Sequence, residues 1–474
     1  ATSGATVRLY PVKPGVGIAS RGRSETFIEI HLGVLDPALH GYLWLLLSAP
    51  ALAPGGTFDD LLGRSERFAA DLGRRLRERI YEDVIGNLGE AIAEARKLRK
   101  PSTSELERTY RATLTLLFRI LFVAYAEDKD LLPYRANARY RGKSLKALAR
   151  EILDVVKAGT PFDTGPQYWA HLKALFRAVD RGNTEWGVPA YNGGLFTTDG
   201  DVSEAGAILA EIELGNDRLG PALRALLLER TDDGVLGPVD FRSLSVREFG
   251  TIYEGLLECE LSVAEEDLTL DKDERYRPVR KAKDKVEVRK GRVYLHGRGG
   301  GRKASGSYYT KDFAVEHLLD QALEPALQEH LARLDELRDP ARAAERLFDF
   351  RVADIAMGSG HFLVAAVDHV ERGLSQYLAK RPLQGVRREL DRLRTKAGEA
   401  LSDAVAASEI EDTQLLRRQI ARRCIYGVDM NAMAVDLARL SVWVHTFVPG
   451  LPLSFLDHNR SEERRVGKEC RSRW

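Results

Sequence analysis

The residues best suited to chemistry lie in the C-terminal half of this 474-residue chain, where glycines and carboxylates follow short apolar segments. Residues 348–355 have the pattern of a buried strand, and Gly358, Ser359 and Gly360 form a turn before a helical pattern starts. Glycines at such a corner let a ligand lie against bare main chain, and the free N–H groups of the helix start attract anions. The spacing therefore predicts a strand, a binding turn and a helix in succession.

A second strand pattern, residues 424–429, ends in Asp429 and is followed by a helical pattern at residues 434–441. In a parallel α/β unit, an acid at the tip of the second strand is placed to accept both hydroxyl groups of a ribose. The turn at Gly358 and Gly360 lacks the third glycine of the dinucleotide fingerprint. Together the two strands favour a nucleoside site of another kind.

Upstream of both strands, residues 306–311 read Gly-Ser-Tyr-Tyr-Thr-Lys and open another amphipathic helix, with an apolar face of Val315, Leu318, Leu319 and Leu323. In this order the three segments resemble the adenine-specific (N6) DNA methyltransferases that use S-adenosylmethionine. The resemblance is closest to the large single-chain enzymes of type IIG restriction-modification and of phage defence.

The resemblance implies a role for each matching residue in a pocket for S-adenosylmethionine. The glycine turn would line the methionine part, the acid that ends the first strand would order that turn, and the second acid would hold the ribose. The two residues after the second acid would flank the adenine, and the upstream Tyr and Thr would close the pocket. The implied cofactor residues are Tyr308, Thr310, Asp354, Ala356, Gly358, Ser359, Gly360, Asp429, Met430 and Asn431. Family members carry prolines where Lys311 and Ile355 stand here, which loosens the two turns without removing a ligand group.

A basic tract precedes these segments. Residues 275–303 hold twelve Lys or Arg against only two acids, whereas the whole chain has a formal charge of +1. Such a cluster suits a phosphate backbone, and the candidate nucleic-acid contacts are Arg280, Lys281, Lys283, Lys285, Arg289 and Lys290. The alternative is a solvated hairpin of two short strands joined near Gly291.

Composition limits the compartment and the class of protein. Three cysteines form no disulfide framework, which favours a reducing cytoplasm. No apolar run reaches the length of a membrane span, and the longest, residues 43–52 and 114–125, are predicted to be buried helices. The chain starts without an initiator Met or a secretion signal, which indicates an internal start. No metal site is predicted.

The predicted fold class is α+β overall, a largely helical connector followed by the first part of an α/β Rossmann-like methyltransferase domain. Residues 1–34 carry strand patterns that form the end of an upstream domain, with an edge strand favoured over a nuclease site at Glu29 and His31. The helical connector covers residues 35–270, the basic tract 271–303 and the methyltransferase part 304–459. Residues 381–422 are helices added between the two strands. Residues 460–474 resemble a translated adapter oligonucleotide and are predicted to be foreign to the protein.

Adenine methylation in this family needs an Asn-Pro-Pro-Tyr type motif, which holds the exocyclic amine of a flipped-out base. No Pro-Pro pair occurs in the sequence, so no catalytic residue is predicted and the chain alone is expected to be inactive. Double-stranded DNA is the expected partner of the whole protein. Two alternatives stay open: a non-enzymatic helical DNA-binding or scaffold protein, and a nicotinamide-dependent oxidoreductase.

Overall fold

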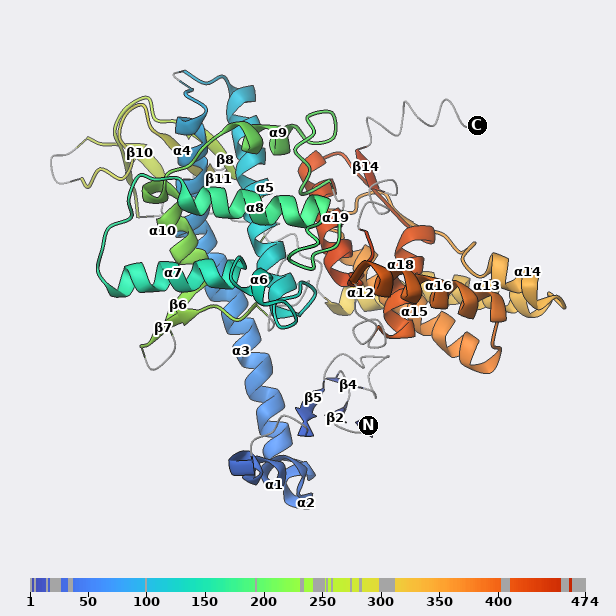
Figure 1. Ribbon diagram of the computed structural model, residues 1–474. Coiled ribbons are helices and arrows are strands. Elements are labelled where there is room, and N and C mark those ends of the chain that lie inside the picture. Colours follow the sequence, from blue (N-terminus) through green and yellow to red (C-terminus); the bar gives the residue numbers. More distant parts are fainter. Residues whose placement is uncertain are drawn as a thin grey trace, which may run out of the picture.

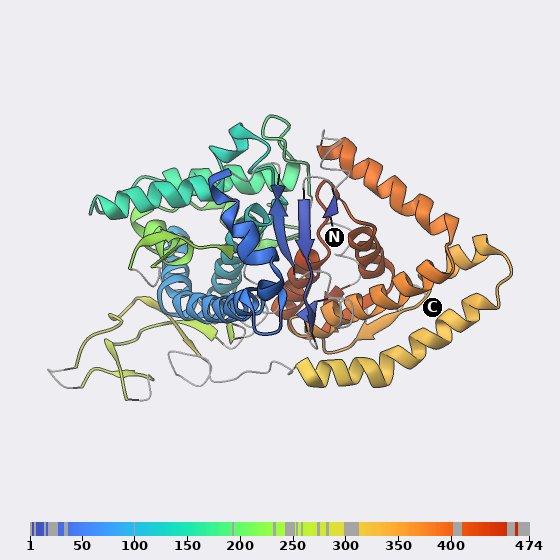
Figure 2. The same ribbon diagram turned by 90° about the horizontal axis from the view of Figure 1, so that it is seen from below.

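The computed structural model places helices around several small sheets (Figure 1), and the predicted α+β class is confirmed. It describes residues 2–3, 6–13, 16–17, 27–32, 37–98, 100–191, 194–230, 234–241, 252, 255–256, 259–272, 275–280, 284–297, 312–401, 410–452 and 460–462. A helical region and a C-terminal region lie side by side (Figures 1 and 2). Among the described residues, no helix has both the length and the apolarity needed to cross a bilayer.

The N-terminal residues form short antiparallel strands. These are β1 (Thr2–Ser3), β2 (Thr6–Leu9), β3 (Val12–Lys13), β4 (Val16–Gly17) and β5 (Ile28–His31). The sheet order β1-β2-β5 leaves β5 at an edge within the described residues, as predicted. Arg8 of β2 contacts Glu411 of the C-terminal region at 3.1 Å, which ties this sheet to its neighbour.

The apolar run at residues 43–52 is helical as predicted, but most of it is exposed or only half-buried, so its predicted burial is wrong. It forms α1 (Gly41–Leu47) and α2 (Ala49–Leu52), which lie at the free end of α3 (Thr57–Arg79) (Figure 1). Trp44 is 76% exposed and Tyr42 is 58% exposed. Helices of seven and four residues cover little of one another, and α3 covers only one side, so hydropathy alone overstates their burial.

The helical region is built around α5 (Thr103–Asp128), which is buried on nearly all sides because its sequence is apolar around most of its circumference. Ser102 and Glu105 form a capping box that fixes its start. The prediction for residues 114–125 is confirmed. The surrounding elements are a π turn (Ile80–Val84), α4 (Ile85–Ala95), α6 (Ala138–Arg141), α7 (Leu145–Lys157), α8 (Gln167–Arg181), α9 (Glu204–Glu211), α10 (Asn216–Leu227), β6 (Leu228–Arg230) and β7 (Leu236–Pro238).

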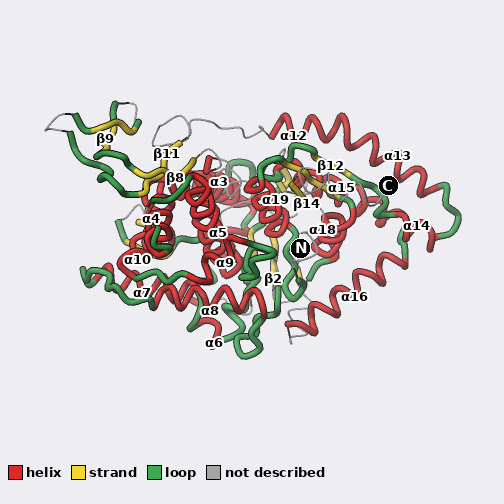
Figure 3. The backbone as a smooth tube through the Cα atoms, turned by 90° about the horizontal axis from the view of Figure 1, so that it is seen from above, coloured by secondary structure: helices red, strands yellow, loops and turns green. Residues whose placement is uncertain are grey.

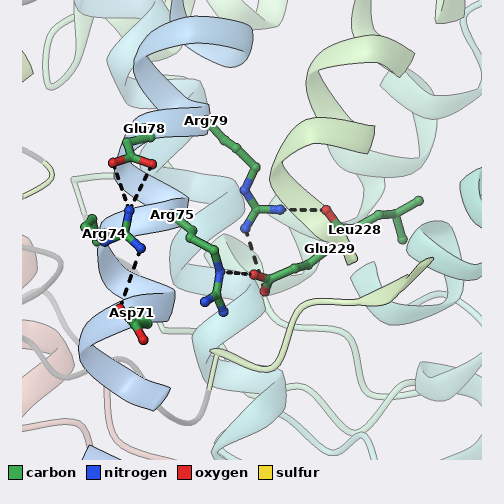
Figure 4. Close-up of polar contacts among 7 residues, drawn as sticks. All are labelled: Asp71, Arg74, Arg75, Glu78, Arg79, Leu228 and Glu229. Carbon is green, nitrogen blue, oxygen red and sulfur yellow. Dashed lines mark hydrogen bonds and ion pairs between the residues drawn. The ribbon is translucent and has the colours of Figure 1, made fainter. Parts of the chain in front are cut away.

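Arginines along α3 divide into two groups (Figure 4). Arg79 donates to the carbonyl of Leu228 at 2.7 Å and, with Arg75, pairs with Glu229, so these two anchor the helix to β6. Within the described residues, Arg74 pairs inside α3, with Asp71 and Glu78. The face of α3 with Arg75 and Arg79 therefore holds the helix against β6. The pairs of Arg74 add little stability, since an exposed pair within one helix contributes only about 0.3–0.5 kcal/mol.

The basic tract belongs to a nested β unit, and the predicted hairpin about Gly291 is wrong. Strand β11 (Val293–Gly297) pairs with β8 (Cys259–Val263), and β10 (Tyr276–Pro278) pairs with β9 (Leu268–Leu270). On the other side of Gly291, Val288 bridges to Leu268. The segments before and after Gly291 therefore do not pair with each other. Each pairs with an upstream strand instead, Val288 with β9 and Val293–Gly297 with β8.

The C-terminal region starts with α12 (Asp312–Leu318), a π turn (Leu319–Leu323), α13 (Glu324–Asp335) and α14 (Pro340–Arg346). Val315, Leu319 and Leu323 are buried, but Leu318 is 49% exposed, so the apolar stripe is narrower than predicted. The remaining elements are β12 (Val352–Asp354), α15 (His361–Lys380), α16 (Gln384–Leu401), α18 (Asp412–Arg423), β13 (Ile425–Asp429), α19 (Ala432–His445) and β14 (Arg460–Glu462). The added helices between the two strands are confirmed as α16 and α18.

The parallel sheet has the order β12-β13-β14, and α15, α18 and α19 pack against it (Figure 3). Within the described residues, β12 pairs on one side only. Strand β14 comes from residues predicted to be foreign, and its pairing with β13 uses main-chain groups, which any sequence offers. The foreign origin therefore stays a prediction, and residues 463–474 lie outside the described part of the chain.

Candidate functional site

The carboxyl ends of β12 and β13 lie at the same edge of the sheet, as predicted. The two strands are parallel, with Val352 opposite Ile425 and Asp354 opposite Gly427. The pairing continues past β12, where the amide of Met357 donates to the carbonyl of Val428 at 3.2 Å. The turn after β12 is therefore held against the end of β13, and the predicted corner exists as one structural unit.

Both glycines of the turn adopt left-handed backbone angles, with φ +52° at Gly358 and +84° at Gly360. A Cβ atom on Gly360 would lie 3.0 Å from the Cα and the Cβ of Ala438 on α19, whereas one on Gly358 would meet nothing within 4 Å. Gly360 is thus needed for the close approach of α15 to α19, and Gly358 leaves open space at the corner.

Asp429 at the tip of β13 closes the corner. One carboxylate oxygen accepts the N–H of Gly358 at 3.0 Å, and the other accepts the N–H of Asn431 at 2.8 Å. The side chain is half-buried. Each carboxylate oxygen has a further lone pair, so Asp429 can hold the glycine turn and still accept a hydroxyl group of a ligand.

Asp354, at the tip of β12, holds the first residues of the same turn. Its carboxylate accepts the N–H of Ala356 at 3.0 Å. Burial raises the pKa of Asp354, the hydrogen bond from Ala356 lowers it, and the nearby charge of Asp429 raises it, with a net upward shift. Two carboxylates at one corner create a negative field, which suits hydroxyl donors and cationic groups.

The other predicted cofactor residues divide by exposure. Met430 is 85% exposed and Asn431 is also exposed at the end of β13, while Ser359 is buried in the turn. Ile355, where the family carries proline, directly follows Asp354 and is 84% exposed. An exposed apolar side chain therefore follows each of the two strand tips. Tyr308 and Thr310 lie outside the described residues.

The basic tract is less positive in space than in sequence. Arg280 pairs with Glu266 at 3.8 Å and Lys285 with Glu287 at 3.0 Å, and the backbone N–H of Lys290 donates to Asp267. Arg289 is exposed, and Lys281 and Lys283 lie outside the described residues. Counting charges along the tract missed Glu266 and Asp267, because they reach it from the turn between β8 and β9.

A pocket of 720 Å³ lies elsewhere, between α8, α5, the loop that follows α8 and the end of α9. None of its lining residues belongs to the glycine corner, and no sequence pattern predicted it. Within the described residues, no group of three or more His, Cys, Asp or Glu side chains could hold a metal ion.

Comparison with known proteins shows a distant similarity to a restriction-modification protein. The chain is similar to a protein of Methanocaldococcus jannaschii named "Putative type II restriction enzyme and methyltransferase", with 23% identity over 381 residues, 73% of this chain and 25% of the relative. The chain thus spans about a quarter of that relative's length. No family model matches the chain, and no solved structure matches it.

Proposed function

We propose that this chain is the S-adenosylmethionine-binding part of a restriction-modification DNA methyltransferase that methylates the N6 of adenine. One observation carries the proposal: the carboxylate at the tip of β13 accepts the N–H of Gly358 in the turn after β12, at 3.0 Å. The name of the similar M. jannaschii protein supports the methyltransferase class. Adenine as the acceptor base is supported by the resemblance of the motifs alone.

The corner fits the parts of this cofactor. Asp429 has lone pairs left for the ribose hydroxyls, and the open space over Gly358 allows a ligand to approach bare main chain. The field of Asp354 and Asp429 suits the positively charged methionine part. Met430 offers an exposed apolar side chain to the adenine. When bound, S-adenosylmethionine supplies an activated methyl group on a sulfonium.

Methyl transfer requires acceptors for the adenine amine and an aromatic face for the flipped base. The family supplies both from an Asn-Pro-Pro-Tyr type motif, and the printed sequence contains no Pro-Pro pair. We therefore propose that residues 304–459 bind the cofactor, that this chain alone transfers no methyl group, and that double-stranded DNA is the substrate of the whole protein.

The proposed DNA contacts are the basic side chains between β10 and β11. Arg289 and Lys290 are exposed there, whereas Arg280 and Lys285 already pair with acids. We expect charge reversal of Arg289 and Lys290 together to weaken binding of duplex DNA about ten-fold and to flatten its salt dependence. Unchanged DNA affinity in a fluorescence anisotropy titration would refute this role.

The cofactor proposal is tested by isothermal titration with S-adenosylmethionine. Asp429→Ala removes the acceptor for Gly358 and Asn431, and we expect affinity to fall about 10- to 100-fold, as for the loss of one or two charge-assisted hydrogen bonds. Asp436→Ala is the matched control, since Asp436 is an exposed acid on α19, where it pairs with Arg439 at 3.2 Å. Equal affinities of the two variants, or methyl transfer by the chain alone, would overturn the proposal.

A further inference from the structure

The pocket beside α8 has features of a binding site that is separate from the glycine corner. Its walls come from α8, α5, the loop after α8 and the end of α9, and its 720 Å³ lies within the usual range for small-molecule sites. Figure 1 labels these three helices. Its chemistry is set by three groups of side chains: one buried cation, a basic rim and an aromatic wall.

The buried cation is Arg119 of α5, which is 3% exposed. Its guanidinium donates to the carbonyl oxygens of Leu195 and Thr197 at 2.7 and 2.8 Å. Within the described residues no carboxylate lies within ion-pair distance of it. Burial lowers the pKa of Arg119 to about 10, and only the more distant Asp180 opposes this shift. These two neutral carbonyls accept N–H groups of Arg119 without cancelling its charge, so the site retains an attraction for an anion.

The rim of the pocket adds three more basic side chains, Lys173, Arg177 and Arg181, all on the exposed side of α8. A single acid, Asp180, lines the pocket with them, and its carboxylate lies 3.7 Å from Arg181. Among the residues that the structure describes, Arg177 has no hydrogen-bond or ion-pair partner. Four cations against one carboxylate leave a strongly positive pocket, and Arg177 is placed to contact a ligand without giving up another interaction.

The wall is aromatic. Trp169, Phe176, Trp186 and Phe196 line the same space. Three of these rings are only 2–4% exposed, so the half-buried Trp186 offers most of the ring surface that a ligand can reach. Two of the cations lie over these rings, with Arg119 5.7 Å from the centroid of Phe176 and Lys173 5.7 Å from that of Trp169. An apolar ligand would leave the cations unused, and a simple inorganic anion would leave most of the aromatic wall uncovered. The pocket suits a molecule with both a flat ring and a negative charge.

We propose that this pocket binds a free nucleoside phosphate, with the base against Trp186 of the aromatic wall and the phosphate on Arg119, Arg177 and Arg181. The site is independent of the proposed methyl-donor site, because the two share no residue. It also has the opposite charge, since the glycine corner presents Asp354 and Asp429.

The test is isothermal titration of the full chain with ATP, with AMP, adenosine and inorganic phosphate as comparison probes. We expect ATP to bind, and Arg177→Glu to weaken it at least ten-fold, as expected for loss of a charge-assisted contact. Arg224→Glu is the matched control, because Arg224 is an exposed helix arginine on α10 outside the pocket. Arg119→Met should abolish ATP binding, with circular dichroism to establish that the variant is folded.

Three outcomes overturn the proposal: no ATP binding, equal ATP binding by Arg177→Glu and the native chain, or binding of inorganic phosphate or a single-stranded oligonucleotide as tightly as ATP. A competition titration separates it from the methyl-donor proposal. ATP should bind equally well in saturating S-adenosylmethionine and in Asp429→Ala. Displacement of one ligand by the other, together with weakened ATP binding in Asp429→Ala, would place ATP at the glycine corner and refute a nucleotide site beside α8, while leaving the cofactor proposal intact.

Discussion

The glycine corner and the pocket beside α8 differ in how they are built. The corner is formed mainly by main-chain groups. Asp429 accepts the N–H groups of Gly358 and Asn431, and Gly358 and Gly360 set the path of the backbone. In the pocket the main chain forms only the frame, and side chains from α5, α8 and the loop after α8 supply the charge and the rings. The corner is negative and open, whereas the pocket is positive and hollow.

This difference predicts how ligands are sorted. Carboxylates at strand tips accept hydroxyl groups and attract cationic groups, while a buried guanidinium with exposed cations around it attracts phosphate. A molecule such as S-adenosylmethionine and a molecule such as ATP share an adenosine, so their charged ends decide between the two sites. Two questions follow: whether each region binds its own ligand, and whether the two regions nevertheless unfold together.

The largest expected effect comes from the contact between the two regions. Phe447, just after α19, is 6% exposed. Its ring centroid lies 5.0 Å from that of Tyr191 and 6.0 Å from that of Phe122. The ring centroid of Phe122 in turn lies 5.3 Å from that of Phe196, which lines the pocket. We expect Phe447→Ala to cost about 3–5 kcal/mol in the free energy of unfolding and Phe447→Leu roughly 1 kcal/mol, by urea denaturation. The two regions should unfold in one transition. Two separate unfolding transitions in the native chain would show that the two regions do not share one hydrophobic core.

A smaller effect, dependent on pH, is expected from Glu127 at the end of α5. Its carboxylate accepts bonds from Tyr140, Leu145 and Lys146, but burial dominates and raises its pKa from 4.5 to about 7. A raised folded-state pKa means that the stabilisation is full below pH about 4.5 and is lost as pH rises through about 7. Relative to the native chain, Glu127→Gln should therefore gain stability on the order of 3 kcal/mol between these limits.

The measurement is urea unfolding of both proteins at several pH values, because the difference between the two curves isolates this group from other titrations. A difference that stays constant with pH would contradict the assignment. The result sharpens the comparison, since Glu127 is sealed inside the helical region, whereas the acids of the corner are only half-buried at strand tips.

Sequence reasoning found the corner because each of its parts is local. A strand pattern, two glycines and an acid at a strand end occupy fixed positions, and the parallel pairing that joins Asp354 to Gly427 follows from the alternation of strand and helix. The pocket left no such signal, because Arg119, Trp186 and Arg177 come from separate segments and look like ordinary helix or loop residues. Side-chain sites of this kind require the tertiary structure.

The errors have the same physical origin. Residues 43–52 are as apolar as those of α5, but hydropathy does not say which element covers them, and Trp44 faces solvent. The turn at Gly291 was predicted correctly as a turn, yet the strand partners lie upstream at Cys259–Val263. The neutralising role of Glu266 was likewise invisible, because charge patterns report neighbours in sequence rather than in space.

The third prediction compares the two glycines of the corner. Both lie in the left-handed region, but only the added Cβ of Gly360→Ala would press on Ala438. We expect Gly360→Ala to cost about 2–3 kcal/mol and Gly358→Ala about 1 kcal/mol, the penalty of the backbone conformation alone. Urea unfolding and titration of S-adenosylmethionine measure both effects. Equal losses of stability and of affinity in the two variants would show that the close packing of α15 on α19 does not constrain the conformation of the glycine corner.

The smallest effect separates the two sites by salt. The rim cations of the pocket are exposed, with the side chain of Arg181 62% accessible, so dissolved ions screen them. Between about 50 mM and about 200 mM NaCl, the affinity for ATP should fall about three-fold, and less in Arg177→Glu. The affinity for S-adenosylmethionine should change by less than about 1.5-fold, because hydrogen bonds to the half-buried Asp429 are screened less. Equal salt dependence of the two ligands would show that both reach the same kind of site, and the contrast between a main-chain corner and a side-chain pocket would no longer account for ligand choice.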